Sequence, residues 1–246
     1  MSTMLVVSAH AGDFVWRAGG AIATHVLRGG RAVVVCLSYG ERGESASQWL
    51  AGKTLEEIKA IRAEEAKAAA DALGAEIRFL DLGDYPLRES DQAITAIVRV
   101  MREIQPDVVL THPLGDPYNG DHPAAARMTL EARVQAQASG VALDGRTPTK
   151  DEIIGAPPVF FFEPHQPEMS GFKPEVLLDV TAGWERKQAA METLPAQKHM
   201  WEYYTQLAIR RGVQLKRNAG PNLGLPVSIM SEAYMRYYPQ VTDTLA

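Results

Sequence analysis

The chain has 246 residues, 46% of them hydrophobic, which is enough to bury a core without a disulfide or a structural metal. The 25 Lys and Arg and the 30 Asp and Glu give a net charge of −5 without a basic run, so nucleic acid and anionic membranes are poor candidate partners. Cys36 is the single cysteine and has no partner for an intrachain disulfide, which favours a reducing compartment. Because the sequence has neither a secretory signal nor an apolar stretch of about 18 residues, we expect a cytoplasmic protein without a membrane segment.

Short β-branched runs alternate with helical patterns through the first two-thirds of the chain. Strands are expected at 4–8, 31–38, 77–80 and 107–111. Helices are expected at 19–28, from a capping box at Thr54 to a stop at Gly74, and at 90–104. Such alternation is typical of parallel strands joined by right-handed crossovers. We therefore predict an α/β fold with a doubly wound, mostly parallel sheet, helices on both faces, and ligands beyond the carboxyl ends of the strands.

The last third of the chain has weaker patterns. The expected elements are a helix at 123–138, strands at 159–162 and 177–180, a helical stretch from 181 to 211, a loop at 220–226 and a last helix at 231–237. We interpret residues 1–246 as a single α/β domain with a helical C-terminal tail at about 181–246. Aromatic residues in this tail suggest the subunit contacts of a homo-oligomer, although packing onto the tail's own domain fits them equally well: Trp201, Tyr203, Tyr204, Tyr234, Tyr237 and Tyr238.

Four of the six histidines follow predicted strands, where the ligand crevice of such a sheet lies. They are His10, with Asp13 three residues later, and His112, His122 and His165. Two imidazole nitrogens from His10 and His122 and one carboxylate oxygen from Asp13 suit Zn²⁺, with a fourth position left for water or substrate. The alternative is that these side chains only cap the helices that follow.

The segments around these residues resemble the PIG-L/LmbE family of zinc-dependent de-N-acetylases. The family pattern A-H-P-D-D, followed by a Gly-Gly helix start, corresponds to 9–13 (Ala-His-Ala-Gly-Asp) with Gly19 and Gly20 downstream. Its second element, a histidine at a strand end followed by D-H, corresponds to His112 and to 121–122. The resemblance implies a Rossmann-like, LmbE-like fold and one Zn²⁺ as cofactor, with the metal ligands His10, Asp13 and His122.

One departure from the family pattern bears on the reaction. In the deacetylases, the first Asp of P-D-D is the general base of amide hydrolysis, and Gly12 stands at that position here. Losing a general base typically costs about 10²- to 10⁴-fold in rate. A chain that has the metal ligands of the family but lacks this general base resembles the hydratase branch of the family. That resemblance implies a lyase that adds water to a C=C bond of a small polycarboxylate during gallate and protocatechuate breakdown.

Hydration of a polycarboxylate needs a group that moves a proton and cations that hold the carboxylates. Glu44 and His165 are the candidates for the proton and the water, since a carboxylate and an imidazole can act as base and acid. Asp121, the third catalytic candidate, would orient an imidazole beside His122. The candidate substrate-binding residues are Arg42, Arg62 and His112. Ordinary roles fit each of them as well, such as a solvated loop carboxylate, a core histidine, a helix cap or a surface ion pair.

Two other functions compete with hydration. The first is a zinc deacetylase acting on an amino sugar or a related amide, in which Asp121 or Glu44 takes over the role of the base. Acetate release from N-acetylglucosamine derivatives would identify it. The second is a zinc-stabilised module without catalysis, which would fold only with metal and would have no perturbed acid or base in its pocket.

Overall fold

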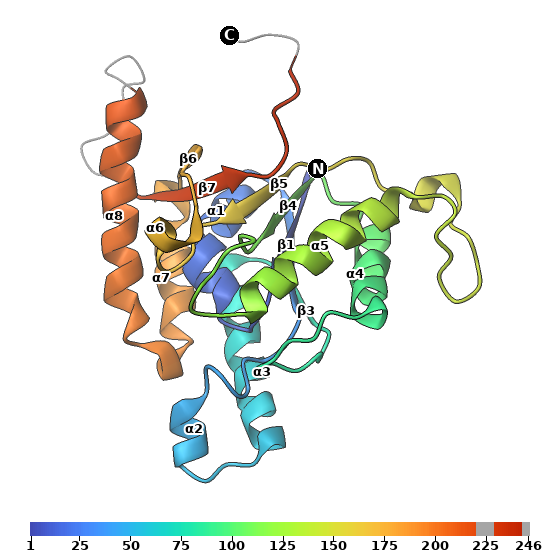
Figure 1. The fold of residues 1–246 in the computed structure, drawn as a ribbon. Helices are drawn as coiled ribbons and strands as arrows, with labels where there is room; N and C mark the ends of the chain where they lie inside the picture. The colour runs from blue at the N-terminus through green and yellow to red at the C-terminus, as the bar shows by residue number, and fades with distance from the viewer. Residues whose placement is uncertain (220–228, 243–246) are drawn as a thin grey trace.

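The computed structural model of the chain describes residues 1–219 and 229–242, and a seven-stranded sheet runs through this part (Figure 1). The strands are β1 (Thr3–Ser8), β2 (Arg31–Cys36), β3 (Glu76–Phe79), β4 (Val108–Thr111), β5 (Val159–Phe162), β6 (Val176–Asp179) and β7 (Ser231–Arg236). The α-helices are α1 (Asp13–Leu27), α2 (Ala46–Leu50), α3 (Leu55–Leu73), α4 (Asp91–Ile104), α5 (Asp121–Gln137), α6 (Pro167–Ser170), α7 (Trp184–Glu192) and α8 (Met200–Ala219). Short 3-10 turns lie at Lys150–Glu152, Thr181–Gly183 and Pro195–Gln197.

The strand order is β3-β2-β1-β4-β5-β7-β6. Strands β1 to β5 are parallel to one another, whereas β7 is antiparallel to both β5 and β6. Because β2 and β4 lie on opposite sides of β1, the chain reverses direction across the sheet between β1 and β4. Ligands of doubly wound sheets bind at such a switch point, beyond the carboxyl ends of the strands. The predicted doubly wound, mostly parallel α/β fold is confirmed.

Helices cover both faces of the sheet and create two apolar cores. Alternate residues of β1 point to opposite sides, so Val6 joins one core and Leu5 the other. The first core contains side chains from α1, α3, α7 and α8, and the second contains side chains from α4 and α5 (Figure 1). Among the described residues, no helix has both the length and the apolar content needed to cross a membrane.

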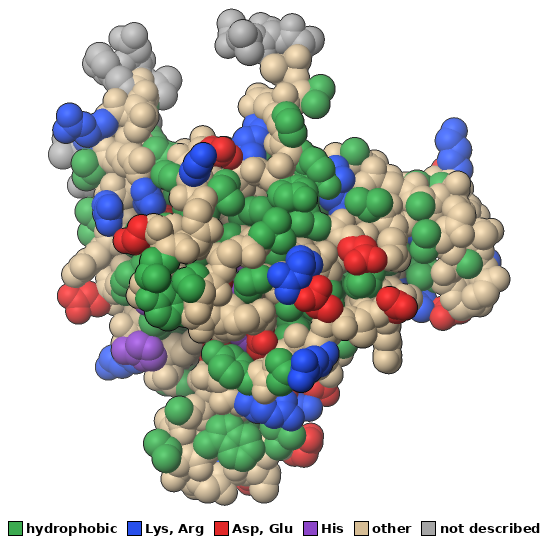
Figure 2. Space-filling model, viewed as in Figure 1, with side chains coloured by type: hydrophobic (Ala, Val, Ile, Leu, Met, Phe, Trp, Pro, Cys, Tyr) green, Lys and Arg blue, Asp and Glu red, His purple; other side chains and the backbone are tan. Residues whose placement is uncertain are grey.

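Several helix ends follow directly from the sequence. Thr54 accepts a hydrogen bond from the N–H of Glu57, whose carboxylate in turn accepts one from the N–H of Thr54, and this capping box starts α3. Gly74 ends α3 in the left-handed conformation, with φ of 78°, which glycine adopts without strain. Charged side chains of both signs are interspersed over the face in Figure 2, in keeping with a sequence that has no basic run.

The structure differs from the sequence analysis in three places. The last helix expected at 231–237 is wrong, because this segment is β7, and the helical tail is therefore helical only up to α8. Helix α1 begins at Asp13 and not at 19, and the short helices α2 and α6 lie in segments where none was expected. The loop expected at 220–226 lies outside the described residues.

A buried ion pair between α7 and β7 also makes hydrogen bonds to the backbone of α1. Lys187 Nζ lies 2.7 Å from Glu232 Oε1, and both residues are almost fully buried. The Glu232 carboxylate accepts hydrogen bonds from the N–H groups of Gly20 and Ala21, each at 2.8 Å, while Lys187 donates one to the carbonyl of Trp16. A Cβ on Gly20 would lie 2.8 Å from Glu232 Oε1, so the glycine makes room for the carboxylate.

Candidate functional site

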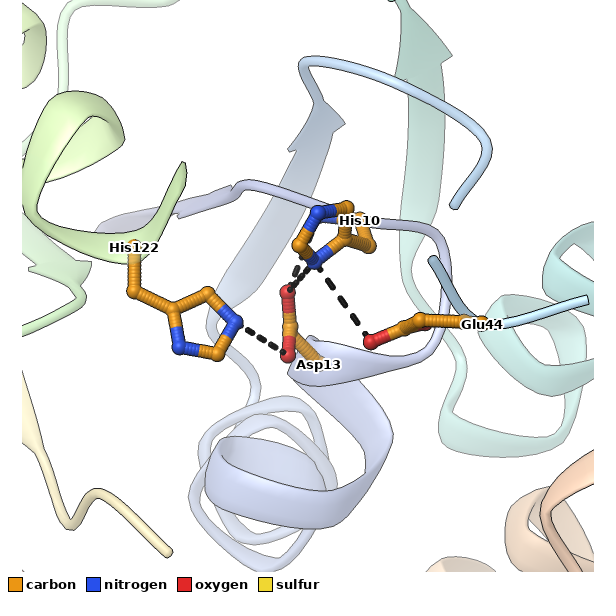
Figure 3. A group of neighbouring side chains, drawn as sticks. All are labelled: His10, Asp13, Glu44 and His122. Atoms are coloured by element: carbon orange, nitrogen blue, oxygen red, sulfur yellow. Dashed lines mark hydrogen bonds and ion pairs between the residues drawn. The ribbon is translucent and has the colours of Figure 1, made fainter. Parts of the chain in front are cut away.

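Four side chains from different elements converge at the switch point between β1 and β4 (Figure 3). His10 follows β1, Asp13 begins α1, Glu44 lies in the loop after β2, and His122 is in the first turn of α5. One ligand atom from each lies within 4.8 Å of those of the other three. His10 Nδ1 is 3.2 Å from Asp13 and 3.4 Å from Glu44, and His122 Nε2 is 3.4 Å from Asp13.

Each of the two imidazoles has a carboxylate on its far nitrogen. His122 Nδ1 is 2.8 Å from Asp116, and His10 Nε2 is 3.2 Å from Asp121. Asp121 is held by the N–H groups of Tyr85 and Leu87 at 2.9 and 2.8 Å. Burial raises the pKa of Asp121, but the hydrogen bonds from His10 and the backbone outweigh it and lower the pKa to about 2. A charged carboxylate of this kind fixes the tautomer and orientation of a metal-binding histidine.

The arrangement fits a divalent metal ion. His122 Nε2 is buried and has no hydrogen-bond partner among the described residues, although it faces Asp13. With Nδ1–H donating to Asp116, this Nε2 carries a lone pair, and a buried lone pair without a donor is costly unless a ligand fills it. Burial alone would lower the pKa of His10, but the nearby Glu44, Asp121 and Asp13 raise it well above its ordinary value. The cluster therefore favours positive charge, and its nitrogen and oxygen donors suit a metal of the zinc type.

Glu44 is the member of the cluster that reaches solvent, with 14% of its side chain exposed. Burial raises its pKa, and the charges of His10 and Arg62 oppose that rise. The fully buried Arg62 donates to Glu44 at 3.4 Å, to Glu65 at 2.6 Å and to the carbonyl of Tyr39 at 3.3 Å. Arg62, which was expected to bind the substrate, therefore positions Glu44. The substrate-binding role of Arg62 stays a prediction.

His112 lies directly behind the cluster. It is fully buried, its ring stacks on that of His122 at 4.1 Å, and the N–H of Ala9 donates to its Nε2 at 3.0 Å. Burial, with the nearby His122, lowers the pKa of His112 to about 3, so the ring is neutral. Its expected contact with substrate stays a prediction.

The remaining predicted residues lie outside the four-residue cluster. His165 is half-buried and stacks on Tyr203 at 4.3 Å, and burial together with the charge of Arg17 lowers its pKa. Arg42 is half exposed and donates to the carbonyl of Asp84 at 3.1 Å. Their proposed roles in catalysis and substrate binding stay predictions.

Comparison with known proteins places the chain in a family. The model of the GlcNAc-PI de-N-acetylase family, PIG-L, matches residues 5–133. A curated relative, the 4-oxalmesaconate hydratase of Pseudomonas putida, is 49% identical over 98% of this chain and 92% of its own. The chain belongs to the PIG-L family.

Solved structures resemble this chain at different levels of sequence identity. The crystal structure of GalB, the 4-carboxy-2-hydroxymuconate hydratase from Pseudomonas putida, superposes with a TM-score of 0.92 and 48% identity over 100% of both chains. The N,N′-diacetylchitobiose deacetylase from Pyrococcus horikoshii has a TM-score of 0.77 at 21% identity, covering 96% of this chain and 83% of its own. At 21% identity, the similarity to the deacetylase shows a shared fold alone.

The departure at Gly12 from the PIG-L pattern has a structural counterpart. A Cβ on Gly12 would lie 2.4 Å from Gln197 Oε1, so the Gln197 amide takes up the space beside this position. This oxygen accepts hydrogen bonds from Trp16 Nε1 at 3.1 Å and from Arg62 at 3.4 Å. An amide does not titrate, and it therefore cannot replace the missing carboxylate as a base.

Sequence reasoning assigned no role to three residues of this PIG-L site. Asp116 backs His122, and its place after β4 was the signal available. Arg17 is buried four residues after Asp13, on the same side of α1, a spacing that the sequence does show. Gln197 comes from a 3-10 turn far along the chain, and no local pattern points to it.

Proposed function

We propose that this chain is a 4-oxalomesaconate hydratase, which adds water to the C=C bond of its substrate to give 4-carboxy-4-hydroxy-2-oxoadipate. The observation that carries the proposal is the 49% identity to the Pseudomonas putida hydratase along nearly the whole of both chains. By contrast, the deacetylase from Rhodococcus erythropolis is 34% identical over 55% of this chain and 54% of its own. In the proposed role, the enzyme works in the cytoplasm in gallate and protocatechuate degradation.

The substrate is a tricarboxylate that exists as tautomers. The names of the two Pseudomonas putida relatives, 4-oxalmesaconate hydratase and 4-carboxy-2-hydroxymuconate hydratase, describe a keto and an enol form of one carbon skeleton. On the keto form, the hydroxyl of water bonds to the carbon that bears the third carboxylate, and a proton bonds to its neighbour. The enzyme must therefore take a proton from water, deliver one to carbon and hold three negative charges.

The metal in this proposal is Zn²⁺, held by His10, Asp13 and His122. Imidazole and carboxylate donors of this kind are typical of catalytic zinc sites, and bound Zn²⁺ would act as a Lewis acid toward an oxygen of the substrate. Asp121 and Asp116 keep the two imidazoles in the tautomers that leave a lone pair facing the cluster.

The proton transfers are assigned to Glu44 and His165. Burial raises the pKa of Glu44 and so moves this carboxyl toward the range in which it can exchange a proton, whereas burial and the charge of Arg17 lower the pKa of His165, so its imidazole is neutral at pH 7 and can accept a proton. Glu44 belongs to the cluster and lies in the loop after β2, whereas His165 lies in the segment after β5 and has Asp116 and His122 among its electrostatic neighbours. This placement suits water addition, in which one group handles the water and the other the carbon.

Two assays separate hydration from deacetylation. The proposal expects metal-loaded protein to remove the conjugated absorption of 4-oxalomesaconate with formation of the hydrated product, and to release no acetate from N-acetylglucosamine derivatives. Acetate release without loss of that absorption would replace the hydratase with a deacetylase. If folded, metal-loaded protein shows neither activity, the result would favour the zinc-stabilised module without catalysis.

A further inference from the structure

Arg17 has unused hydrogen-bonding capacity beside the metal cluster. We propose that it binds one carboxylate of the substrate and so selects a tricarboxylate, an inference that rests on the proposed hydratase function. Arg17 lies on α1 one turn after Asp13, and its side chain is only 6% exposed. A guanidinium offers five N–H donors in a planar fork that matches a carboxylate.

The contacts of Arg17 within the chain are few and long. Its Nε is 3.5 Å from Asp13, and one terminal nitrogen is 3.5 Å from the carbonyl of Glu163, both at the outer limit of a hydrogen bond. The neighbouring Arg211 shows what a satisfied guanidinium looks like, because it pairs with both carboxylate oxygens of Glu163. A buried guanidinium with so few close hydrogen bonds gains from an anion that binds its free N–H groups.

The carboxylates around the cluster favour a further cation there. Asp13, Glu44, Asp116 and Asp121 all lie at or beside the cluster, and each negative charge that the metal, His10 and Arg62 do not neutralise repels a polycarboxylate. Among these four, Asp13, Asp116 and Glu44 are electrostatic neighbours of Arg17, which therefore lies at the acidic centre of the site.

The other two arginines near the site have closer partners within the chain than Arg17 has. Arg62 is fully buried and bound to two carboxylates, and Arg42 is half exposed and bound to the loop at Asp84. Arg17 is also an electrostatic neighbour of His165, so a carboxylate held by Arg17 would lie near both the cluster and that imidazole.

A purely structural role for Arg17, in which it only neutralises Asp13, makes a different prediction. In that role, loss of Arg17 would disturb Asp13 and lower metal content. In the proposed role, the metal stays and the affinity for the carboxylate changes, because the Arg17–Asp13 contact is long and involves one nitrogen.

The experiment measures binding of non-reacting probes to metal-loaded protein. Calorimetry would compare propane-1,2,3-tricarboxylate with glutarate, which lacks the middle carboxylate, for wild type, Arg17→Gln, Arg17→Lys and the charge-matched surface control Arg99→Gln. Arg17→Gln should weaken tricarboxylate binding about 10- to 100-fold and bring its affinity close to that of glutarate, with metal content unchanged. Arg17→Lys, which keeps the charge and loses the fork, should fall between these values, and it also serves if Arg17→Gln does not fold. Arg99→Gln should match wild type.

The outcomes distinguish this inference from the proposed function. Unchanged tricarboxylate affinity in both Arg17 variants, loss of metal in both, or no tricarboxylate binding to wild type would each overturn the role of Arg17. Binding that depends on Arg17 in a protein that does not hydrate 4-oxalomesaconate would uphold Arg17 and refute the hydratase. Hydration with an unchanged KM in the Arg17 variants would refute Arg17 alone.

Discussion

Replacing Glu232 with Gln should destabilise the fold by about 3–5 kcal/mol, because it leaves a buried ammonium without its counter-charge. Lys187 Nζ is 2.7 Å from Glu232 and, within the described part of the chain, has one other acceptor, the carbonyl of Trp16 at 2.8 Å. Glu232 also accepts two backbone N–H groups, one on each oxygen, from Gly20 and Ala21. A glutamine has a single acceptor oxygen, so one of these N–H groups would face an NH₂ donor.

This loss should appear as a large change in melting temperature. For chains of 150–250 residues, each kcal/mol shifts Tm by roughly 2–4 °C, so Glu232→Gln should lower Tm by about 6–20 °C. Lys187→Met should be similarly harmful, since it leaves the buried carboxylate unpaired. The double variant should lose clearly less than the sum of the two, with a coupling of about 1–3 kcal/mol, because no buried charge is left alone.

Differential scanning calorimetry of the four proteins would test this prediction, with Arg31→Gln as a matched control. Arg31 pairs with Glu76 at 2.7 and 2.8 Å, a geometry as good as that of the buried pair, but on the surface. Such exposed pairs contribute roughly 0–1 kcal/mol. Equal Tm losses for Glu232→Gln and Arg31→Gln, or additive losses in the double variant, would refute the reasoning.

Four further predictions concern the site. Metal titration should show that His122→Ala abolishes stoichiometric binding and that Asp116→Asn weakens it by about 10- to 100-fold, and unchanged binding in both would remove the metal assignment. Glu44→Gln should lower kcat by about 10²-fold or more with metal retained, and near-normal turnover would exclude it from proton transfer. The pKa of His165 is lowered, and its neutral form is the base, so kcat/KM should fall as the pH drops through a value below 6.5. If this fall in kcat/KM persists in His165→Asn, the assignment of His165 is wrong. Gly12→Asp should not raise hydratase turnover, since the new side chain displaces the amide beside it, and a large rise would mark this position as a lost base.

The parallel half of the sheet could be predicted because its signals are local. Each buried strand is a run of β-branched and other apolar residues, and Thr54 and Ser90 cap the starts of α3 and α4, so β1 to β5 and these two helices are where the sequence predicts them. The grouping of His10, Asp13 and His122 followed from the same logic, since carboxyl ends of parallel strands meet at one edge.

Strand β7, next to the edge strand of the sheet, could not be predicted in this way. Residues 231–236 read Ser-Glu-Ala-Tyr-Met-Arg, and Glu, Ala and Met favour a helix. The segment is a strand because it fills the place between β5 and β6, and such pairing depends on contacts far apart in the chain. Gln197 was missed for the same reason, since its place beside Gly12 exists only after the tertiary fold has formed.

The contact between Glu232 and α1 also bears on the order in which the chain is synthesised. Translation delivers every proposed metal ligand by residue 122, but the carboxylate of Glu232, which binds Gly20 and Ala21, is made 110 residues later. A nascent chain whose β7 has not yet left the ribosome therefore has the metal ligands, but α1, which carries Asp13, lacks its hydrogen bonds to Glu232. We expect the site to mature after synthesis of the strand and not during translation of the N-terminal half, so that ribosome-bound or prematurely ended chains hold metal poorly.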